Sequence, residues 1–98
     1  MNRQEHLLLI LEEECIETAQ RVSKALRFSL EEVQPGQELS NADRLIYEFN
    51  DIVAMMEMLH DEGLIKDFHD PLAIIKKKSK VEKFLKLSKE HGTLTGDA

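Results

Sequence analysis

The chain has 98 residues, a length that suits a single domain, and 42% of them are hydrophobic, so it is globular rather than disordered. Its formal net charge is −6, but residues 1–65 hold 14 acids and 5 bases, whereas residues 66–98 hold 5 acids and 8 bases. An acidic body of this kind argues against binding to a nucleic-acid polymer, which needs a basic surface. The single cysteine, Cys15, excludes an internal disulfide and makes a thiolate zinc site a poor fit.

The N-terminal segment has one early arginine and five apolar residues, followed at once by acids. It is too short and too acidic for a signal peptide. No apolar run approaches the roughly 20 residues that a membrane-spanning helix needs. We therefore expect a cytoplasmic protein without a membrane partner.

The first predicted helix runs from about Arg3 to Phe28 and carries one apolar stripe, with residues at steps of three and four. The stripe consists of Leu8, Leu11, Cys15, Ala19, Val22 and Leu26. Leu7, Leu9 and Ile10 lie off it, so the first turns are apolar nearly all round. A monomer of three helices cannot bury all of this surface. We therefore expect a second copy to cover it, in a homodimer or homotetramer.

The second predicted helix starts near Ser40 or Asn41, runs to about Glu62 and stops at Gly63. Before it, Ser29 and Glu32 are spaced as in a capping box, which predicts a short turn ahead of the Pro35-Gly36 pair. Four polar residues of the helix share a narrow stripe that we assign to solvent: Asp43, Asn50, Glu57 and Asp61. The rest of this helix is almost wholly apolar.

The third predicted helix begins at Pro71, with Asp70 as its N-cap, and ends near Gly92. A narrow stripe of Ile74, Val81, Phe84, Leu85 and Ser88 runs along it, and lysines occupy most of the remainder. The predicted fold is thus all-α, a bundle of three main helices in one domain over residues 1–92. Residues 93–98 are predicted to be a flexible tail, and oligomerisation would complete four-helix-type bundles.

Two pairs of acids stand out from this pattern. Glu48 and Asp51 are three residues apart, share one helix face and lie in the apolar part of the second helix. An unpaired buried carboxylate takes up a proton or finds a cation, because burying its charge alone is costly. For a single acid, pairing with Arg21, Arg44 or a lysine would suffice.

Glu14 and Glu17 form a second pair, also three apart and away from the first helix's apolar stripe. If the first two helices pack antiparallel, the lengths at 1.5 Å per residue bring this pair level with Glu48 and Asp51. Four oxygen donors without cysteine or paired histidine favour Mg²⁺ or Mn²⁺ over zinc. A di-iron bundle would need Glu-x-x-His pairs, which neither segment has. Glu12 and Glu13 are assigned to solvent.

The segments "EEECIE" and "EFNDIVAMMEML" resemble the signature of the all-α nucleoside triphosphate pyrophosphohydrolases, the MazG-like family. In that family Glu-x-x-Glu is followed, on the next helix, by Glu-x-x-Asp. Glu14 and Glu17 match the first pair, and Glu48 and Asp51 match the second. The resemblance covers about residues 7–59, and the basic third helix is similar to the last helix of small, often phage-type members.

The resemblance implies Mg²⁺-dependent hydrolysis of a (d)NTP between the α- and β-phosphates, which gives the (d)NMP and pyrophosphate. It implies that the four carboxylates hold the metal and carry the catalysis. Candidates for substrate contact are Arg21, Lys77, Lys78, Lys80 and Tyr47. Arg21 could equally be an ion-pair partner, and a solvated basic face is favoured for most of the lysines. No tryptophan is present to stack a base. His6, Phe28 and Tyr47 could do so, with core packing favoured for the last two.

Two alternatives stay open at this stage. One is a non-catalytic helical oligomer, an interaction protein whose acids are all ion-paired. The other is a metal-binding bundle without hydrolysis. The apolar setting of Glu48 and Asp51 separates the first alternative from an enzyme, since a scaffold would be more stable with leucine at those positions.

Overall fold

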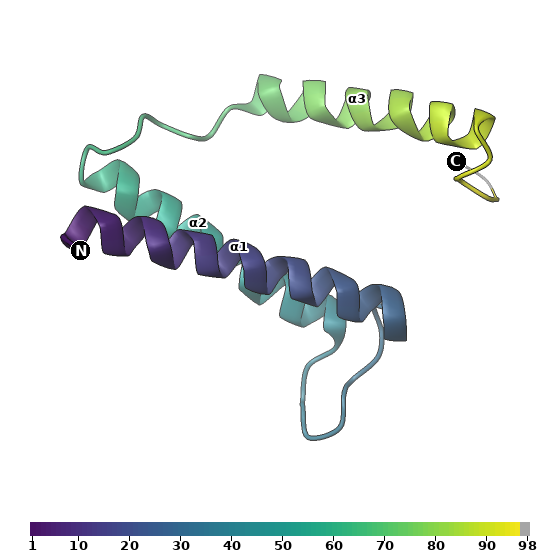
Figure 1. Cartoon of the computed structure of the whole chain (residues 1–98), viewed down its shortest axis with the longest axis horizontal. Coiled ribbons are helices and arrows are strands. Elements are labelled where there is room, and N and C mark those ends of the chain that lie inside the picture. The colour runs from purple at the N-terminus through teal and green to yellow at the C-terminus, as the bar shows by residue number, and fades with distance from the viewer. Residues whose placement is uncertain (97–98) are drawn as a thin grey trace. The chain divides into compact units, whose positions relative to one another are not determined.

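Three helices make up the regular structure of residues 1–96, the part of the chain that this computed structural model describes (Figure 1). They are α1 (Arg3–Phe28), α2 (Asn41–Asp61) and α3 (Pro71–Glu90). These bounds confirm the all-α fold and the three predicted helices. The chain divides into two compact units, Met1–Lys66 and a second that begins at Asp67, and each is described by itself.

Every helix starts at a side-chain cap. Asn2 accepts from the backbone N–H of Glu5 and forms a full capping box with it. Ser40 accepts from the N–H of Asp43, and Asp70 accepts from the N–H of Ala73. These bonds satisfy backbone donors that a helix N-terminus leaves free, which is why the predicted starts were accurate.

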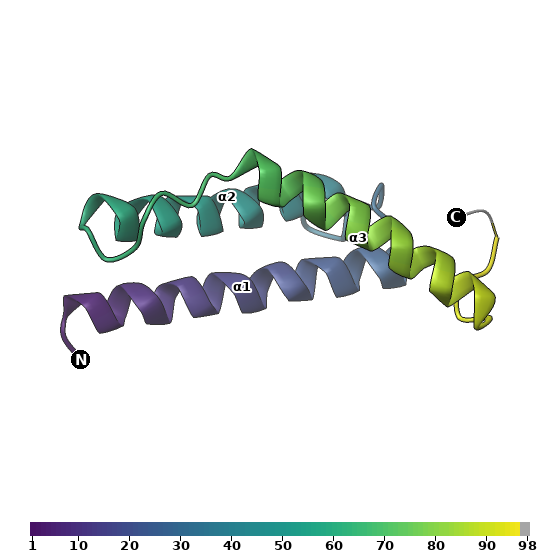
Figure 2. The same ribbon diagram turned by 90° about the horizontal axis from the view of Figure 1, so that it is seen from above.

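The helices α1 and α2 run antiparallel and side by side, as both views show (Figures 1 and 2). At one end, Arg3 Nε and Nη2 donate to the two carboxylate oxygens of Glu62, each at 2.9 Å. Next to this pair lies the apolar core of the unit, made by Leu7, Met55 and Leu59. The apolar contact and the two-bond ion pair together hold the register of the hairpin.

The face of α1 that meets α2 is not the predicted apolar stripe. Leu7 is 5% exposed although it lies off that stripe, whereas Leu8, Val22 and Leu26 on it are 46%, 44% and 83% exposed. Cys15 is also exposed, so its predicted packing role is not found within the chain. Periodicity identifies an apolar face but not the element that covers it, and α2 packs on a neighbouring face. Apart from Leu11, which packs against the core, the predicted stripe is left uncovered in the hairpin.

The connection between α1 and α2 is built around Asn41, which is fully buried. Its Nδ2 donates to the backbone oxygen of Ser29 at 2.9 Å and to Glu32 Oε1 at 3.3 Å. The predicted capping box of Ser29 and Glu32 does not form, and no helical turn follows Phe28. The reason is tertiary: Ser29 has a φ of 83° and Glu32 bonds to Asn41 instead. The Pro35-Gly36 turn forms as expected.

The second unit consists of α3 and the residues around it. None of the described α3 side chains is fully buried, and of its predicted stripe only Leu85 and Ser88 are partly covered. The backbone N–H groups of Thr93 and Leu94 donate to the Ser88 oxygen. Thr93 and Leu94 are the first residues of the predicted tail 93–98. Its last two residues, 97 and 98, lie outside the described part of the chain.

None of the helices described here combines the length and the apolarity that crossing a membrane requires.

Candidate metal centre

The interface between α1 and α2 changes character along its length. At one end the side chains of Leu7 and Leu11 meet α2, and further along the same face of α1 the partly buried residues include Glu14, Thr18 and Arg21. The interface side of α2 changes in the same way, from the buried Leu59 at the apolar end to the partly buried Glu48 in the middle. Acids therefore replace apolar residues in the middle of a helix–helix interface.

Register explains why Glu17 faces Glu48. The same number of residues separates Arg3 from Glu17 as separates Glu48 from Glu62. Because α1 and α2 are antiparallel and rise equally per residue, the pairing of Arg3 with Glu62 places Glu17 opposite Glu48. The capped ends and the apolar core of the hairpin thus position the acids.

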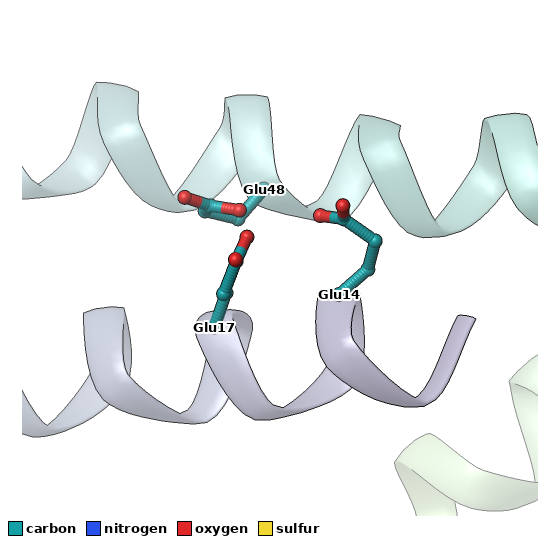
Figure 3. A group of neighbouring side chains, drawn as sticks. All are labelled: Glu14, Glu17 and Glu48. Carbon is teal, nitrogen blue, oxygen red and sulfur yellow. The ribbon is translucent and has the colours of Figure 1, made fainter. Parts of the chain in front are cut away.

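Three carboxylates converge at this level (Figure 3). One oxygen from each of Glu14, Glu17 and Glu48 lies within 4.8 Å of the other two. Glu14 and Glu17 project from α1 toward α2, and Glu48 comes from α2 itself (Figure 3). We call these three residues the acidic cluster. It is the one group of this kind among residues 1–96, so sequence reasoning missed no member.

Asp51, the fourth predicted ligand, does not join the cluster. It is exposed, and no oxygen of it falls within the 4.8 Å set. It is nevertheless close enough that its negative charge raises the pKa of Glu14 and of Glu48.

Two carboxylate oxygens of the acidic cluster have no hydrogen-bond partner within residues 1–96. Glu14 Oε2 and Glu48 Oε2 are both buried atoms and neither accepts a hydrogen bond in the described chain. The nearby cation is Arg21, whose Nε lies 3.9 Å from Glu48 Oε1, too far for a hydrogen bond. Buried acceptors without donors are uncommon in proteins, and here two belong to neighbouring acids.

The pKa values of two of these acids respond to that environment. Burial raises the pKa of Glu14 above its ordinary value, and the charges of Glu17, Asp51 and Glu48 raise it further. Burial also raises the pKa of Glu48, and the charges of Glu17 and Asp51 add to this, while Arg21 opposes it. The cluster therefore holds more negative charge than its surroundings balance, which a bound cation would correct.

The predicted substrate-contact residues fall in different places. Arg21 lies at the acidic cluster. Tyr47, next to Glu48 in sequence, is 64% exposed, and Phe28 is exposed too, so the core packing favoured for both is not found within the chain. The lysines Lys77, Lys78 and Lys80 are exposed on α3, in the second unit, where Lys80 Nζ lies 5.8 Å from the centre of the Phe84 ring.

Comparison with protein-family models, with curated proteins and with solved structures finds no match to this chain.

Proposed function

We propose that this protein is a Mg²⁺-dependent nucleotide pyrophosphohydrolase that cleaves a (d)NTP between the α- and β-phosphates to the (d)NMP and pyrophosphate. The observation that carries the proposal is the acidic cluster of Glu14, Glu17 and Glu48, with two buried oxygens that have no partner. The MazG-like pattern of Glu14, Glu17, Glu48 and Asp51 supports the same function, since three of its four acids come together across α1 and α2.

The donor set suits a hard divalent cation. All its ligand atoms would be carboxylate oxygens, which Mg²⁺ and Mn²⁺ prefer, and neither histidine nor cysteine belongs to the cluster. The raised pKa values of Glu14 and Glu48 fit as well, because they measure repulsion that a cation relieves. Glu14, Glu17 and Glu48 would hold the ion, with Asp51 able to reach it from the edge of the interface.

The chain's own groups have defined parts in the proposed reaction. Bound Mg²⁺ would supply electrophilic stabilisation of the phosphate oxygens. One glutamate of the cluster accepts a proton from the water that attacks the α-phosphorus, and the P–O bond to the β-phosphate breaks with pyrophosphate as leaving group. Lys77, Lys78, Lys80 and Tyr47 remain candidates for contact with the nucleotide.

The proposal includes a homodimer or homotetramer in the cytoplasm. In the Met1–Lys66 unit only three hydrophobic side chains are fully buried, while Leu8, Val22 and Leu26 lie in the open. A shallow apolar hollow adjoins them, lined by Val22, Ala25, Leu26, Leu30 and Leu45. Exposed apolar area of this extent indicates a surface that another chain covers.

The same exposed surface favours the second candidate, a helical oligomer that binds metal or a protein partner without hydrolysis. The version of this candidate in which all acids are ion-paired is disfavoured, because neither Glu14 nor Glu17 forms an ion pair within residues 1–96. A metal-binding oligomer without catalysis would keep the cluster and lack turnover.

The deciding experiment incubates the full chain with canonical and modified (d)NTPs plus Mg²⁺ and measures release of pyrophosphate and monophosphate. We expect turnover of at least one nucleotide and a loss of about 100-fold or more in Glu48→Gln. Glu13→Gln removes the same charge from an exposed position on α1 and should keep the activity. No turnover by the wild type would leave the non-catalytic candidate.

A further inference from the structure

Arg21 is an arginine with unused hydrogen-bonding capacity. Its side chain is 19% exposed, and both Nε and Nη1 are buried without a hydrogen-bond partner among the described residues. A buried donor without an acceptor loses its hydration and gains nothing in return. Both donors lie beside the acidic cluster and remain without a hydrogen bond in the described chain, because Glu48 stays 3.9 Å away.

The geometry around Arg21 shows which charges compete for it. Arg21 follows Glu17 by one helical turn on α1, and Glu48 approaches from α2. The 3.9 Å between Arg21 Nε and Glu48 Oε1 allows charge attraction but no hydrogen bond. At Arg3, by contrast, the guanidinium gives two hydrogen bonds of 2.9 Å to one carboxylate. Arg21 therefore balances charge at the cluster while its Nε and Nη1 groups stay without a hydrogen-bond partner in the part of the chain that the structure describes.

We propose that Arg21 couples the metal site to an anion site: it is the counter-ion of Glu48 while the cluster holds no divalent cation, and its unpaired Nε and Nη1 groups donate to a diphosphate anion once a cation has taken over that charge. The proposal rests on the proposed function and adds an order of events to it, with the cation first and the anion second.

Electrostatics gives the reason for the coupling. A divalent cation on Glu14, Glu17 and Glu48 repels the guanidinium and removes its attraction to Glu48. The released Nε and Nη1 groups can each donate a charge-assisted hydrogen bond to the anion, whereas a lysine offers a single compact ammonium group. Without the cation, the negative cluster repels the same anion. Arg21 thus weakens the binding of the divalent cation and strengthens the binding of the diphosphate anion.

The test measures two affinities in the full-length protein at pH 8. Binding of Mn²⁺ alone is followed by the electron paramagnetic resonance signal of free Mn²⁺. Binding of methylenediphosphonate, a pyrophosphate analogue that cannot be hydrolysed, is followed by calorimetry at saturating Mg²⁺. The variants are Arg21→Gln and Arg21→Lys. The matched control is Arg27→Gln, which removes the same charge from α1 where the guanidinium stacks on Phe28, with 4.8 Å to the ring centre.

We expect opposite effects in Arg21→Gln. Mn²⁺ should bind about tenfold more tightly because a nearby positive charge is gone. Methylenediphosphonate should bind about 10–100-fold more weakly because charge-assisted hydrogen bonds are lost. Arg21→Lys, which keeps the charge without the planar fork, should hold Mn²⁺ as the wild type does and still lose diphosphonate affinity. Arg27→Gln should match the wild type in both.

A purely structural role for Arg21 would weaken both affinities together, and that result would overturn the proposal. Unchanged Mn²⁺ affinity or unchanged diphosphonate affinity in Arg21→Gln would overturn it as well. Wild-type protein that binds no Mn²⁺ would overturn the proposed function and this inference with it. If the wild type binds Mn²⁺ and hydrolyses a nucleotide, but Arg21→Gln has the same two affinities as the wild type, the inference is overturned while the proposed function stands.

Discussion

Two arginine–glutamate contacts cross the same helix interface and behave differently. Arg3 and Glu62, at the exposed end of the hairpin, form two hydrogen bonds of 2.9 Å, and this pairing lowers the pKa of Glu62. Arg21 and Glu48, half-buried in the middle, approach only to 3.9 Å. The pKa of Glu48 is raised despite the arginine, first by burial and then by the charges of Glu17 and Asp51.

The difference shows that an arginine nearby does not by itself settle the charge of an acid. Glu62 is paired with Arg3, and its side chain is partly exposed to solvent. Glu48 has Glu14 and Glu17 beside it, only one arginine of the described residues within 4 Å, and a side chain that is 21% exposed. One positive charge cannot balance three negative ones, and the interface therefore has one end that maintains the hairpin and a middle part whose negative charge is left unbalanced.

The largest effect on stability should come from the apolar end. Leu59 is 1% exposed and packs with Leu7 and Met55, so Leu59→Ala should lower the free energy of unfolding by about 2–5 kcal/mol. Glu57→Ala, on the exposed face of the same helix, should change it by less than about 0.5 kcal/mol. Urea denaturation followed by circular dichroism measures both. Equal effects would mean that Leu59 does not anchor the hairpin.

The second effect concerns the metal. At a free Mg²⁺ concentration 100 times its Kd, binding to the folded chain should raise the free energy of unfolding by about 2.7 kcal/mol. Glu48→Gln should abolish this stabilisation, and Asp51→Asn should only reduce it, because Asp51 stands outside the cluster. Glu62→Gln should leave it intact. Thermal unfolding with Mg²⁺ and with EDTA tests this, and a full response in Glu48→Gln would place the metal elsewhere.

The third effect is the pH dependence of stability in metal-free protein, which should differ in sign between Glu48 and Glu62. The raised pKa of Glu48 means that the folded state binds its proton more readily than the unfolded state, so stability falls as the pH rises through the raised pKa. Glu48→Gln should therefore be more stable than the wild type at pH 7. This advantage should shrink as the pH falls toward the ordinary glutamate value of about 4.3. Denaturation in EDTA across this range measures it.

Glu62 should give the opposite sign in the same experiment. Its lowered pKa means that the ionised carboxylate stabilises the fold above the ordinary value, and this contribution disappears as the pH falls through the lowered pKa. Glu62→Gln should then be less stable than the wild type at pH 7 and equal to it in acid. The same sign for Glu48→Gln and Glu62→Gln would contradict the contrast between the two sites.

The smallest effect should come from the exposed pair itself. Arg3 and Glu62 are both open to water, so a double-mutant cycle of Arg3→Gln and Glu62→Gln should give a weak coupling that vanishes at high salt. Denaturation at two salt concentrations checks this. A strong coupling that resists salt would show that the pair is shielded, for example by a second copy of the chain.

Much of the local structure was accessible from the sequence, because its causes are local. Ser40 and Asp70 start α2 and α3 by accepting hydrogen bonds from residues three positions ahead, and Gly63 has the positive φ of 75° that ends α2. The spacing of Glu14 with Glu17 likewise put both on one face of α1. These features depend on contacts within a few residues and needed no knowledge of packing.

The packing partners could not be predicted in the same way. The apolar stripe through Leu8 and Leu26 was the stronger periodic signal, yet α2 covers the face that carries Leu7. Ser29 and Glu32 matched a local capping pattern, but Asn41, twelve residues beyond Ser29, takes part in the bonds that form instead. Local patterns fail where a distant residue offers a competing contact.

The sequence by itself determined three helices, their caps and the presence of paired acids on two of them, since helix periodicity and capping are properties of neighbouring residues. Only the tertiary structure decided that Glu14, Glu17 and Glu48 meet while Asp51 stays at the edge, and that Arg21 reaches Glu48 without bonding to it. The physical reason is that the charge and hydration of a carboxylate depend on everything packed around it, and that environment is set by the register of two helices from distant parts of the chain.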